Sequence, residues 1–329
     1  MRAPRGWRNP RPGLIARALS PLGALYGSVT ARRMARPGVR VGVPVVCVGN
    51  FVVGGAGKTP TAIAIARVLR AAGERPAFLS RGYGGAARAD SLRVGGAESA
   101  AKVGDEPLLL ARVAPCFVGP DRIASARLAI EDGASVLVMD DGLQNPSLEK
   151  ALTIVVVDGE APFGNGLCLP AGPLRAPVAA QWPFVDAIVI IGGEAETAAE
   201  LAGRAPQKPV FRASLKADAI AASELIGRPV LAFAGIADPQ KFFATLASVG
   251  AQVVETAVFP DHWPFRPREI ERLVARAARN SLTLVCTEKD LVRLPASNAE
   301  EVRALPVTLS FEKPAAVAAW LGVRRRIIP

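Results

Sequence analysis

The sequence predicts an α/β fold in which helices flank a mostly parallel sheet, with a second, smaller α/β domain. Apolar, β-branched runs alternate with helical stretches along most of the 329 residues, as in sheets whose parallel strands are joined by helices. Half of the residues are hydrophobic, which is ample for a core. The alternation restarts near Arg228. We therefore expect an N-terminal segment at residues 1–40, a core domain at 41–215 and a smaller domain at 216–329.

Residues 1–40 form a basic segment that fits the surface of an anionic membrane. The first acidic residue is Glu74, so residues 1–73 carry only positive charge. Apolar residues with helical spacing lie between groups of arginines, as in helices of the membrane interface. A first helix packed on the core, with a solvated charged face, explains the same pattern, and both interpretations stay open. Pro21 favours two short helices, with Ser20 capping the second. The apolar residues are Leu14, Ile15, Ala18, Leu19, Leu22, Leu25, Tyr26 and Val29.

Composition limits the partners of the chain. It has 40 Lys+Arg and 29 Asp+Glu, and the net charge of +11 favours nucleic acid, an anionic membrane or a phosphorylated substrate. Aromatic residues make up only 5% and no nucleic-acid-binding motif occurs, so we expect no nucleic acid. No apolar run reaches the ~20 residues that span a bilayer, and Arg17 and Pro21 interrupt any signal peptide. The widely spaced cysteines are typical of a reduced protein core, not of disulfides or a zinc site.

The first strand of the core domain leads into a phosphate-binding loop. Residues 43–48 are an apolar run typical of a buried strand, and residues 61–72 have a helical pattern. The glycine-rich loop between them exposes backbone N–H groups before a helix N-terminus, which favours phosphate. We expect Lys58 to reach the β- and γ-phosphates and the Thr59 hydroxyl to bind Mg²⁺. Val52 stands where the general motif has its first glycine. The predicted nucleotide-binding residues of the loop are Gly54, Gly55, Ala56, Gly57, Lys58, Thr59 and Pro60.

Two later loops contain candidate substrate and catalytic residues. Residues 75–79 form a predicted strand, and the glycine-containing loop after it presents Arg81 and Tyr83 as candidate substrate contacts. Asp105 precedes a helical stretch at 108–113. This aspartate suits the N-cap of that helix, and it also suits a general base for a hydroxyl group. The spacing does not decide between the two roles.

Another strand ends in paired acids that are candidate magnesium ligands. Apolar residues 136–139 lead into Asp140 and Asp141, an arrangement that places a carboxylate near Mg²⁺ downstream of a phosphate loop. Gln144, on the same loop, is a candidate nucleotide contact. After a strand at 152–157, the loop at 163–177 contains three glycines and three prolines, which indicates a shaped loop.

That shaped loop contains two more candidates. Asn165 is a candidate substrate contact, and Arg175, the only cation of the loop, is a candidate to stabilise charge on a transferring phosphoryl group.

In the smaller domain, His262 is the only histidine of the protein, beside an acid at a predicted strand end. Catalytic and structural roles both stay open for it. Residues 287–290 follow the next predicted strand, a position that matches that of His262. We expect both to line one cleft.

In their order along the chain, these motifs resemble tetraacyldisaccharide 4′-kinase, the kinase of the lipid A pathway. The resemblance covers roughly residues 40–295. The chain departs from the family pattern at Leu143, Asn145 and Ala176, where the family usually has Phe, His and Glu. The matching segments are residues 48–50, 54–60, 80–84, 103–107, 140–144, 164–166, 169–175, 235–236, 259–262 and 287–290.

The resemblance implies an activity and a location. It implies transfer of the ATP γ-phosphate to the 4′-hydroxyl of a tetraacylated disaccharide 1-phosphate, with Mg²⁺ as cofactor and lipid IVA as product. It also implies a peripheral protein at the cytoplasmic face of the inner membrane of a Gram-negative bacterium, and we expect no obligate protein partner.

The resemblance also implies roles for individual residues. Phosphate and Mg²⁺ are held by Lys58 and Thr59. The paired acids of residues 140–141 serve the metal site, with Gln144 beside them. Arg175 is similar to the charge-stabilising arginine of the family. The remaining pair, Asp105 and His262, resembles the base dyad that takes the proton of the 4′-hydroxyl.

A phosphate-loop GTPase or metallochaperone is the alternative function, because such proteins share the Gly-Gly-x-Gly-Lys-Thr loop. Guanine recognition usually needs Asn/Thr-Lys-x-Asp. The nearest run here is residues 215–218, in which Leu215 cannot make the amide or hydroxyl contact. A metallochaperone needs a His/Cys cluster, which one histidine and four dispersed cysteines do not favour.

Overall fold

The computed structural model describes the chain except residues 1–3, 56, 87–89, 96–97, 205 and 328–329, and its described residues form two sheets. The large sheet has nine strands in the order β13-β8-β7-β6-β1-β5-β2-β4-β3. The edge strands β13 and β3 pair antiparallel with their neighbours, and the other pairs are parallel. The predicted α/β fold with a mostly parallel sheet is therefore confirmed.

The central strand β1 explains why this sheet needs helices on both faces. All of its residues are buried, and alternate side chains point to opposite faces. Val48 packs in the same cluster as Ile65 and Leu321, from the helices of one face, whereas Val45 packs with Ala126 on the other face. The strands are β1 (Val45–Gly49), β2 (Pro76–Ser80), β3 (Leu92–Arg93), β4 (Cys116–Val118), β5 (Val136–Asp140), β6 (Leu152–Asp158), β7 (Ala187–Ile191), β8 (Val210–Ala217) and β13 (Val307–Phe311).

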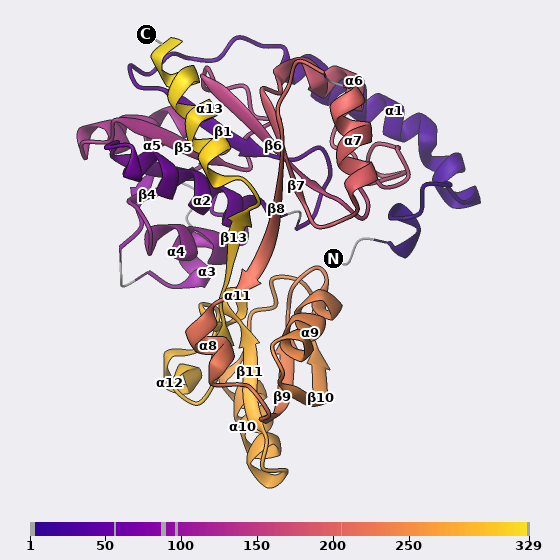
Figure 1. Ribbon diagram of the computed structural model, residues 1–329, viewed down its shortest axis with the longest axis vertical. Coiled ribbons are helices and arrows are strands. Elements are labelled where there is room, and N and C mark those ends of the chain that lie inside the picture. Colours follow the sequence, from indigo (N-terminus) through magenta and orange to yellow (C-terminus); the bar gives the residue numbers. More distant parts are fainter. Residues whose placement is uncertain (1–3, 56, 87–89, 96–97, 205, 328–329) are drawn as a thin grey trace.

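Helices cover both faces of the large sheet (Figure 1). One face is covered by α2 and α13, and the opposite face by α5 and, nearer β7, by α7. The helices of this part are η1 (Arg5–Trp7), α1 (Leu14–Met34), α2 (Lys58–Ala71), α3 (Ala100–Val103), α4 (Asp105–Ala111), α5 (Arg122–Glu131), α6 (Val178–Gln181), η2 (Trp182–Phe184), α7 (Ala195–Arg204) and α13 (Pro314–Ile327).

The smaller sheet has its own two-sided core. Its four strands, in the order β10-β9-β11-β12, are all parallel. Along β9, Val230 and Ala232 pack toward α9, while Leu231 and Phe233 pack toward α10. The elements are α8 (Ala219–Ser223), β9 (Pro229–Ala234), α9 (Pro239–Ser248), β10 (Gln252–Val258), α10 (Pro267–Arg279), β11 (Thr283–Thr287), α11 (Glu288–Leu291), α12 (Ala296–Ala299) and β12 (Arg303–Leu305).

The chain returns to the large sheet after the smaller one. Strand β13 pairs with β8, with Val307 opposite Ala217, and α13 then packs against α2. Figure 1 shows β8 and β13 running side by side toward the smaller unit. Residues 307–327, which the sequence assigned to the smaller domain, therefore lie on the large sheet. The division into domains at residues 40 and 215 otherwise stays a prediction.

Helix α1 is continuous, so the expected break at Pro21 is wrong. Proline lacks the N–H that would bond the carbonyl four residues earlier, which belongs to Arg17. The hydroxyl of Ser20 donates to that carbonyl oxygen at 2.7 Å. Ser20 therefore satisfies the freed acceptor inside one helix and does not cap a second.

Two glycines of α1 allow a close approach to the loop at 163–177. A Cβ on Gly23 would lie 2.6 Å from the backbone oxygen of Cys168, and one on Gly27 would lie 2.8 Å from its Sγ. Since atoms cannot pack so closely, any side chain there must push the helix or the loop away.

We expect Gly23→Leu to destabilise the protein by about 1–3 kcal/mol, because the added side chain overpacks the contact with the Cys168 backbone. The measurement is urea unfolding. Ala24→Leu, at an exposed neighbouring position of α1, is the control and should change stability little. Equal stability of the two variants would contradict this packing.

Candidate active site

The loop after β1 has the geometry of a phosphate-binding loop. Gly54 and Gly57 have φ values of 111° and 83°, which favour glycine. No side chain caps the N-terminus of α2 among the described residues, so its first N–H groups are available to a ligand. Pro60 lies in the first turn of α2, where its missing N–H has no consequence. Gly55 is exposed beside them, and Ala56 lies outside the described residues.

Lys58 joins this loop to the paired acids. Its Nζ donates to the Gly54 carbonyl at 3.0 Å and lies 3.9 Å from Oδ2 of Asp141. The paired acids are close because β5 is the neighbour of β1, with Asp140 opposite Val48. Sheet order therefore brings together two motifs that are about eighty residues apart in the sequence.

Asp140 has the surroundings of a ligand to a cation. Oδ2 accepts from the Thr59 hydroxyl at 2.9 Å, and Oδ1 is buried with no partner among the described residues. Burial, followed by the charges of Glu106 and Asp141, raises the pKa of Asp140 to about 7. A bound cation would offset each of these effects.

The residues at this position fit Mg²⁺ held together with nucleotide phosphates. Within the described part of the chain, no group of three or more His, Cys, Asp or Glu side chains could hold a metal by itself. Magnesium typically binds one or two carboxylates and completes its shell with water and phosphate. The Thr59 hydroxyl and the free oxygen of Asp140 match that donor set.

Arg175 holds the second acid. Its two terminal nitrogens donate to Asp141 at 2.8 and 2.9 Å, and Nη1 also lies 3.3 Å from Oε1 of Gln144. Burial would raise the pKa of Asp141, but Lys58 and Arg175 outweigh it and lower this pKa. The Gln144 amide nitrogen is engaged by the Asn50 carbonyl at 2.8 Å and by another glutamine side chain. Gln144 therefore supports Arg175, and its role as a nucleotide contact stays a prediction.

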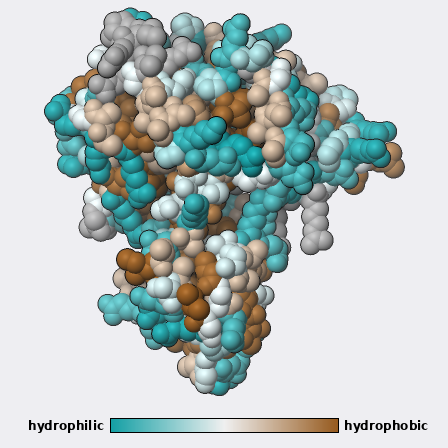
Figure 2. Space-filling model, viewed as in Figure 1, coloured by the Kyte–Doolittle hydropathy of each residue, from teal (hydrophilic) through white to brown (hydrophobic). Residues whose placement is uncertain are grey.

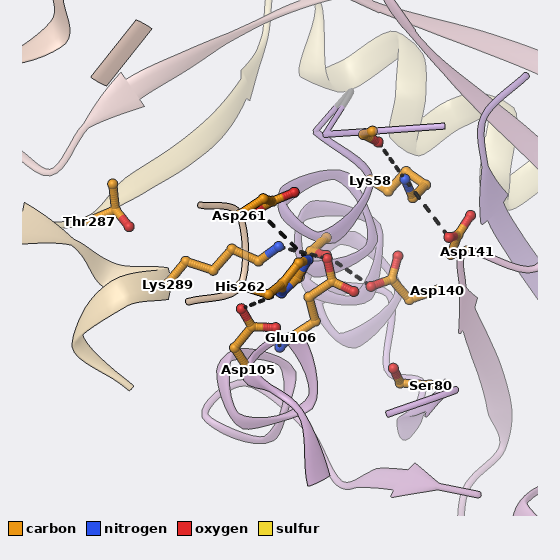
Figure 3. A network of polar contacts seen from close by, with 12 residues as sticks. Lys58, Ser80, Asp105, Glu106, Asp140, Asp141, Asp261, His262, Thr287 and Lys289 are labelled. Atoms are coloured by element: carbon orange, nitrogen blue, oxygen red, sulfur yellow. Dashed lines mark hydrogen bonds and ion pairs between the residues drawn. The ribbon is translucent and has the colours of Figure 1, made fainter. Parts of the chain in front are cut away.

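Asp105 and His262 meet across the two sheets. His262 Nδ1 lies 2.9 Å from Asp105 Oδ2, although the residues are 157 positions apart. Figure 3 shows this pair on one side of the network and Lys58 with Asp141 on the other. Gly104 holds the N-cap position of α4 and Asp105 is the first helical residue, so the N-cap interpretation is wrong. The Tyr83 ring packs edge-on against His262 at 5.4 Å.

Cations from the smaller unit surround the Asp105 carboxylate. Arg293 Nε lies 3.4 Å from Oδ2, and Lys289 Nζ pairs with the adjacent Glu106 at 2.8 Å. Burial would raise the pKa of Asp105, but the hydrogen bond to His262 and the charges of Lys289 and Arg293 outweigh it and lower this pKa to about 2. Asp105 is therefore ionised at neutral pH.

Sequence reasoning missed part of this network. It did not single out Glu106, Arg293 or the Arg112–Glu288 pair, whose atoms lie 2.7 Å apart. These side chains lie where α4 and the residue after it meet α11 and the residues after it. The only signal was the polar run at residues 287–290, which has no visible partner in the sequence. Figure 3 shows Glu106 between the His262–Asp105 pair and Asp140, in agreement with its effect on the Asp140 pKa.

The other two candidate substrate contacts, Asn165 and Arg81, differ in exposure. The Asn165 side chain donates to the Ala171 carbonyl at 3.0 Å and accepts from the Leu167 N–H at 3.1 Å. It is buried and stabilises its own loop, so the structure does not support a substrate contact there. Arg81 is exposed at the end of β2.

We expect Asp105→Asn to lower the free energy of unfolding by about 2 kcal/mol at pH 6, from the difference between the usual pKa of 3.8 and the folded value of about 2. Because the folded pKa is the lower one, the stabilisation is complete above about pH 4 and disappears toward pH 2. Urea unfolding across this range should show the gap to wild type closing. Glu196→Gln, at an exposed acid, is the control. A gap that persists at pH 2 would contradict the assignment.

Comparisons with known proteins show the family of the chain. A model of the family described as tetraacyldisaccharide-1-P 4′-kinase matches residues 15–324. The tetraacyldisaccharide 4′-kinase of Methylobacterium sp. (strain 4-46) is 56% identical over 313 residues, covering 94% of this chain and 93% of that protein. The protein of the same name from Bradyrhizobium diazoefficiens is 51% identical over 320 residues, covering 96% and 94%.

A solved structure extends the similarity to the fold. The crystal structure of an "apo" form LpxK from Aquifex aeolicus in complex with ATP aligns with a TM-score of 0.74 and 25% sequence identity. The alignment covers 94% of this chain and 99% of that one. It confirms a phosphate-loop NTPase-like sheet flanked by helices. With matches over nearly its full length, the chain belongs to the tetraacyldisaccharide 4′-kinase family.

Proposed function

We propose that this protein transfers the γ-phosphate of ATP to the 4′-hydroxyl of a tetraacyldisaccharide 1-phosphate, with Mg²⁺, at a membrane surface. The observation that carries this proposal is the Asp105–His262 pair, which faces the phosphate loop and the paired acids from the opposite side of one site. A hydroxyl kinase needs a proton acceptor there, opposite the phosphates that it binds.

The nucleotide side of the site uses Lys58, Thr59 and the N-terminus of α2. The N–H groups of the loop and the lysine would bind the phosphates, and Thr59 and Asp140 would hold the magnesium. Bound Mg²⁺ would neutralise charge on the phosphates. Arg175 is fixed by Asp141 and would stabilise charge on the transferring group.

The acceptor side uses the ionised Asp105 to orient His262. With the proton of the imidazole on Nδ1, donated to Asp105 Oδ2 at 2.9 Å, Nε2 is left as the basic nitrogen. Nε2 then accepts the proton of the attacking 4′-hydroxyl. Because His262 comes from the smaller unit, movement of the two units toward each other assembles the site and excludes water.

The GTPase alternative has little support. Leu215 lies within β8, and the Asp218 side chain accepts from the N–H groups of residues 220 and 221 as the cap of α8. An aspartate engaged in this way is not available to a guanine base.

The exposed surface of helix α1 supports a location of the protein at a membrane surface. It packs through glycines and exposes a row of apolar side chains between exposed arginines, which suits the interface of an anionic bilayer. Figure 2 shows hydrophobic and hydrophilic surface side by side at its projecting end. Among the described residues, no helix is long and apolar enough to span a membrane. The exposed apolar residues are Leu14, Ile15, Leu22, Leu25, Tyr26 and Val29.

Phosphate transfer tests the activity. Wild type with γ-labelled ATP, Mg²⁺ and tetraacyldisaccharide 1-phosphate in mixed micelles should give a labelled lipid. Lys58→Ala and Asp105→Ala should each lower kcat by about 100-fold or more, because they remove phosphate binding and the oriented base. Arg127→Gln, at an exposed arginine, is the control. No labelled lipid from wild type would disprove the kinase proposal.

Liposome binding tests the membrane role. Replacing Leu14, Leu22 and Leu25 with serine should weaken binding to phosphatidylglycerol vesicles by about tenfold or more, because each exposed leucine loses its burial in the bilayer. The matched control replaces three exposed aliphatic residues of the smaller unit: Ile220, Ile226 and Val254. Equal binding of the two triple variants would rule out α1 as the membrane contact.

A further inference from the structure

The histidine of the acceptor side lies in a strained turn. His262 has a φ of 56°, in the left-handed region that favours glycine. The Trp263 N–H donates to the Pro260 carbonyl at 3.2 Å, which places His262 third in a four-residue turn. A side chain in this conformation costs free energy, and the surrounding structure must hold it there. The contacts that hold the turn therefore decide where the imidazole points.

The guanidinium of Arg293 holds this turn through two backbone carbonyls. Nη1 donates to the Trp263 carbonyl at 3.3 Å, and Nη2 donates to the Gly235 carbonyl at 2.9 Å. The same Gly235 carbonyl accepts the N–H of His262 at 3.1 Å. The planar fork of one arginine thus fixes both the residue after His262 and the acceptor of the His262 N–H.

The buried Asp290 fixes that guanidinium in turn. Its Oδ1 accepts from Nη2 of Arg293 at 2.7 Å and from the Gly235 N–H at 2.9 Å. Its Oδ2 accepts from the Thr287 hydroxyl at 2.6 Å, and the residue is fully buried. The polar run at residues 287–290, which the sequence placed beside the cleft, therefore anchors the arginine from within the smaller unit.

Arg293 also reaches the partner of His262 on the large sheet. Its side chain is only 6% exposed, its Nε donates to the Lys289 carbonyl at 3.0 Å, and its Cζ lies 5.6 Å from the centroid of the Phe265 ring. The same Nε lies 3.4 Å from Asp105 Oδ2, the oxygen that lies 2.9 Å from His262 Nδ1. One guanidinium thus contacts the carboxylate of the pair directly and the imidazole through its backbone.

We propose that Arg293 is a positioning residue for phosphoryl transfer, which holds the turn of His262 so that Nδ1 faces Asp105 and Nε2 is left for the acceptor hydroxyl. This inference rests on the proposed function for the role of His262 as the base. A displacement of a reacting group by about 1 Å can lower a rate about 100-fold. Loss of Arg293 should therefore slow the chemical step, although the arginine itself does not touch the reacting atoms.

The single histidine of the chain makes the state of its imidazole measurable without activity. The full chain, labelled with nitrogen-15 histidine and free of a histidine tag, should show two separate ring-nitrogen signals at pH 8, with the proton on Nδ1. Arg293→Gln should move both signals toward the average of the two tautomers, because the ring no longer stays against Asp105. Arg272→Gln, at an exposed arginine of the same unit, is the control and should leave them unchanged.

Kinetics test the link from this position to catalysis. With labelled ATP and the acylated acceptor, Arg293→Gln should lower kcat about 10- to 100-fold and change KM for ATP by less than about twofold. The reason for the split is that no hydrogen bond or ion pair joins Arg293 to the phosphate loop among the described residues. Arg293→Lys keeps the charge, but its single nitrogen cannot reach both carbonyls, so kcat and the ring-nitrogen signals should be intermediate.

Arg293→Lys decides alone if the glutamine variant does not fold. Wild-type kcat and ring-nitrogen signals in Arg293→Lys would overturn the inference, and so would unchanged signals in Arg293→Gln. A lower kcat with unchanged signals would mean that Arg293 acts elsewhere, which also contradicts the proposal. A wild-type protein that transfers no phosphate would disprove the proposed function, while the ring-nitrogen signals would still decide whether Arg293 positions the imidazole.

Discussion

The contact between Asp105 and His262 is the constraint on which the site depends. It joins the first residue of α4, on the large sheet, to the loop after β10, on the smaller one. Ion pairs from α11 and the residues after it reinforce this contact, since Lys289 pairs with Glu106 and Arg293 with Asp105. Because the two halves come from different sheets, the relative placement of those sheets decides whether His262 lies opposite the phosphate loop.

Two buried aspartates of the site have opposite electrostatic surroundings. Asp105 lies among His262, Lys289 and Arg293, and its pKa is lowered to about 2, whereas that of Asp140 is raised to about 7. The first arrangement keeps a carboxylate charged so that it orients an imidazole. The second leaves negative charge in excess, which suits a position that binds a cation. Different environments thus give the same residue type different tasks.

Helix α1 connects exposed leucines to the loops of the candidate active site. Its glycine side lies on the loop that also contains Arg175, and its opposite side exposes leucines. The side chain of Arg33, near the end of α1, donates to the backbone carbonyl of Gln144 at 3.3 Å. A membrane-bound α1 would therefore hold the catalytic loops close to the bilayer, where an acylated acceptor presents its headgroup.

The sequence by itself determined the features that are local. The phosphate loop with Lys58 and the acids at Asp140 could be predicted because strand, loop and helix follow one another within a few residues. The alternation of strands and helices was enough for the α/β class. The family motifs identified Asp105 and His262, but they gave no distance between the two side chains.

Only the tertiary structure decided what depends on distant neighbours. The 2.9 Å contact between Asp105 and His262 spans 157 residues, and the ion pair between Lys289 and Glu106 spans 183. Pro21 was misread for the same reason, since the Ser20 hydroxyl bond to the Arg17 carbonyl is invisible in the sequence. The bond that holds Asn165 within its own loop was equally invisible. The sequence shows which chemical groups are present and how far apart they lie in the chain. The burial and the bonding partners of a side chain, which set its charge and its availability, arise only when the two sheets pack together.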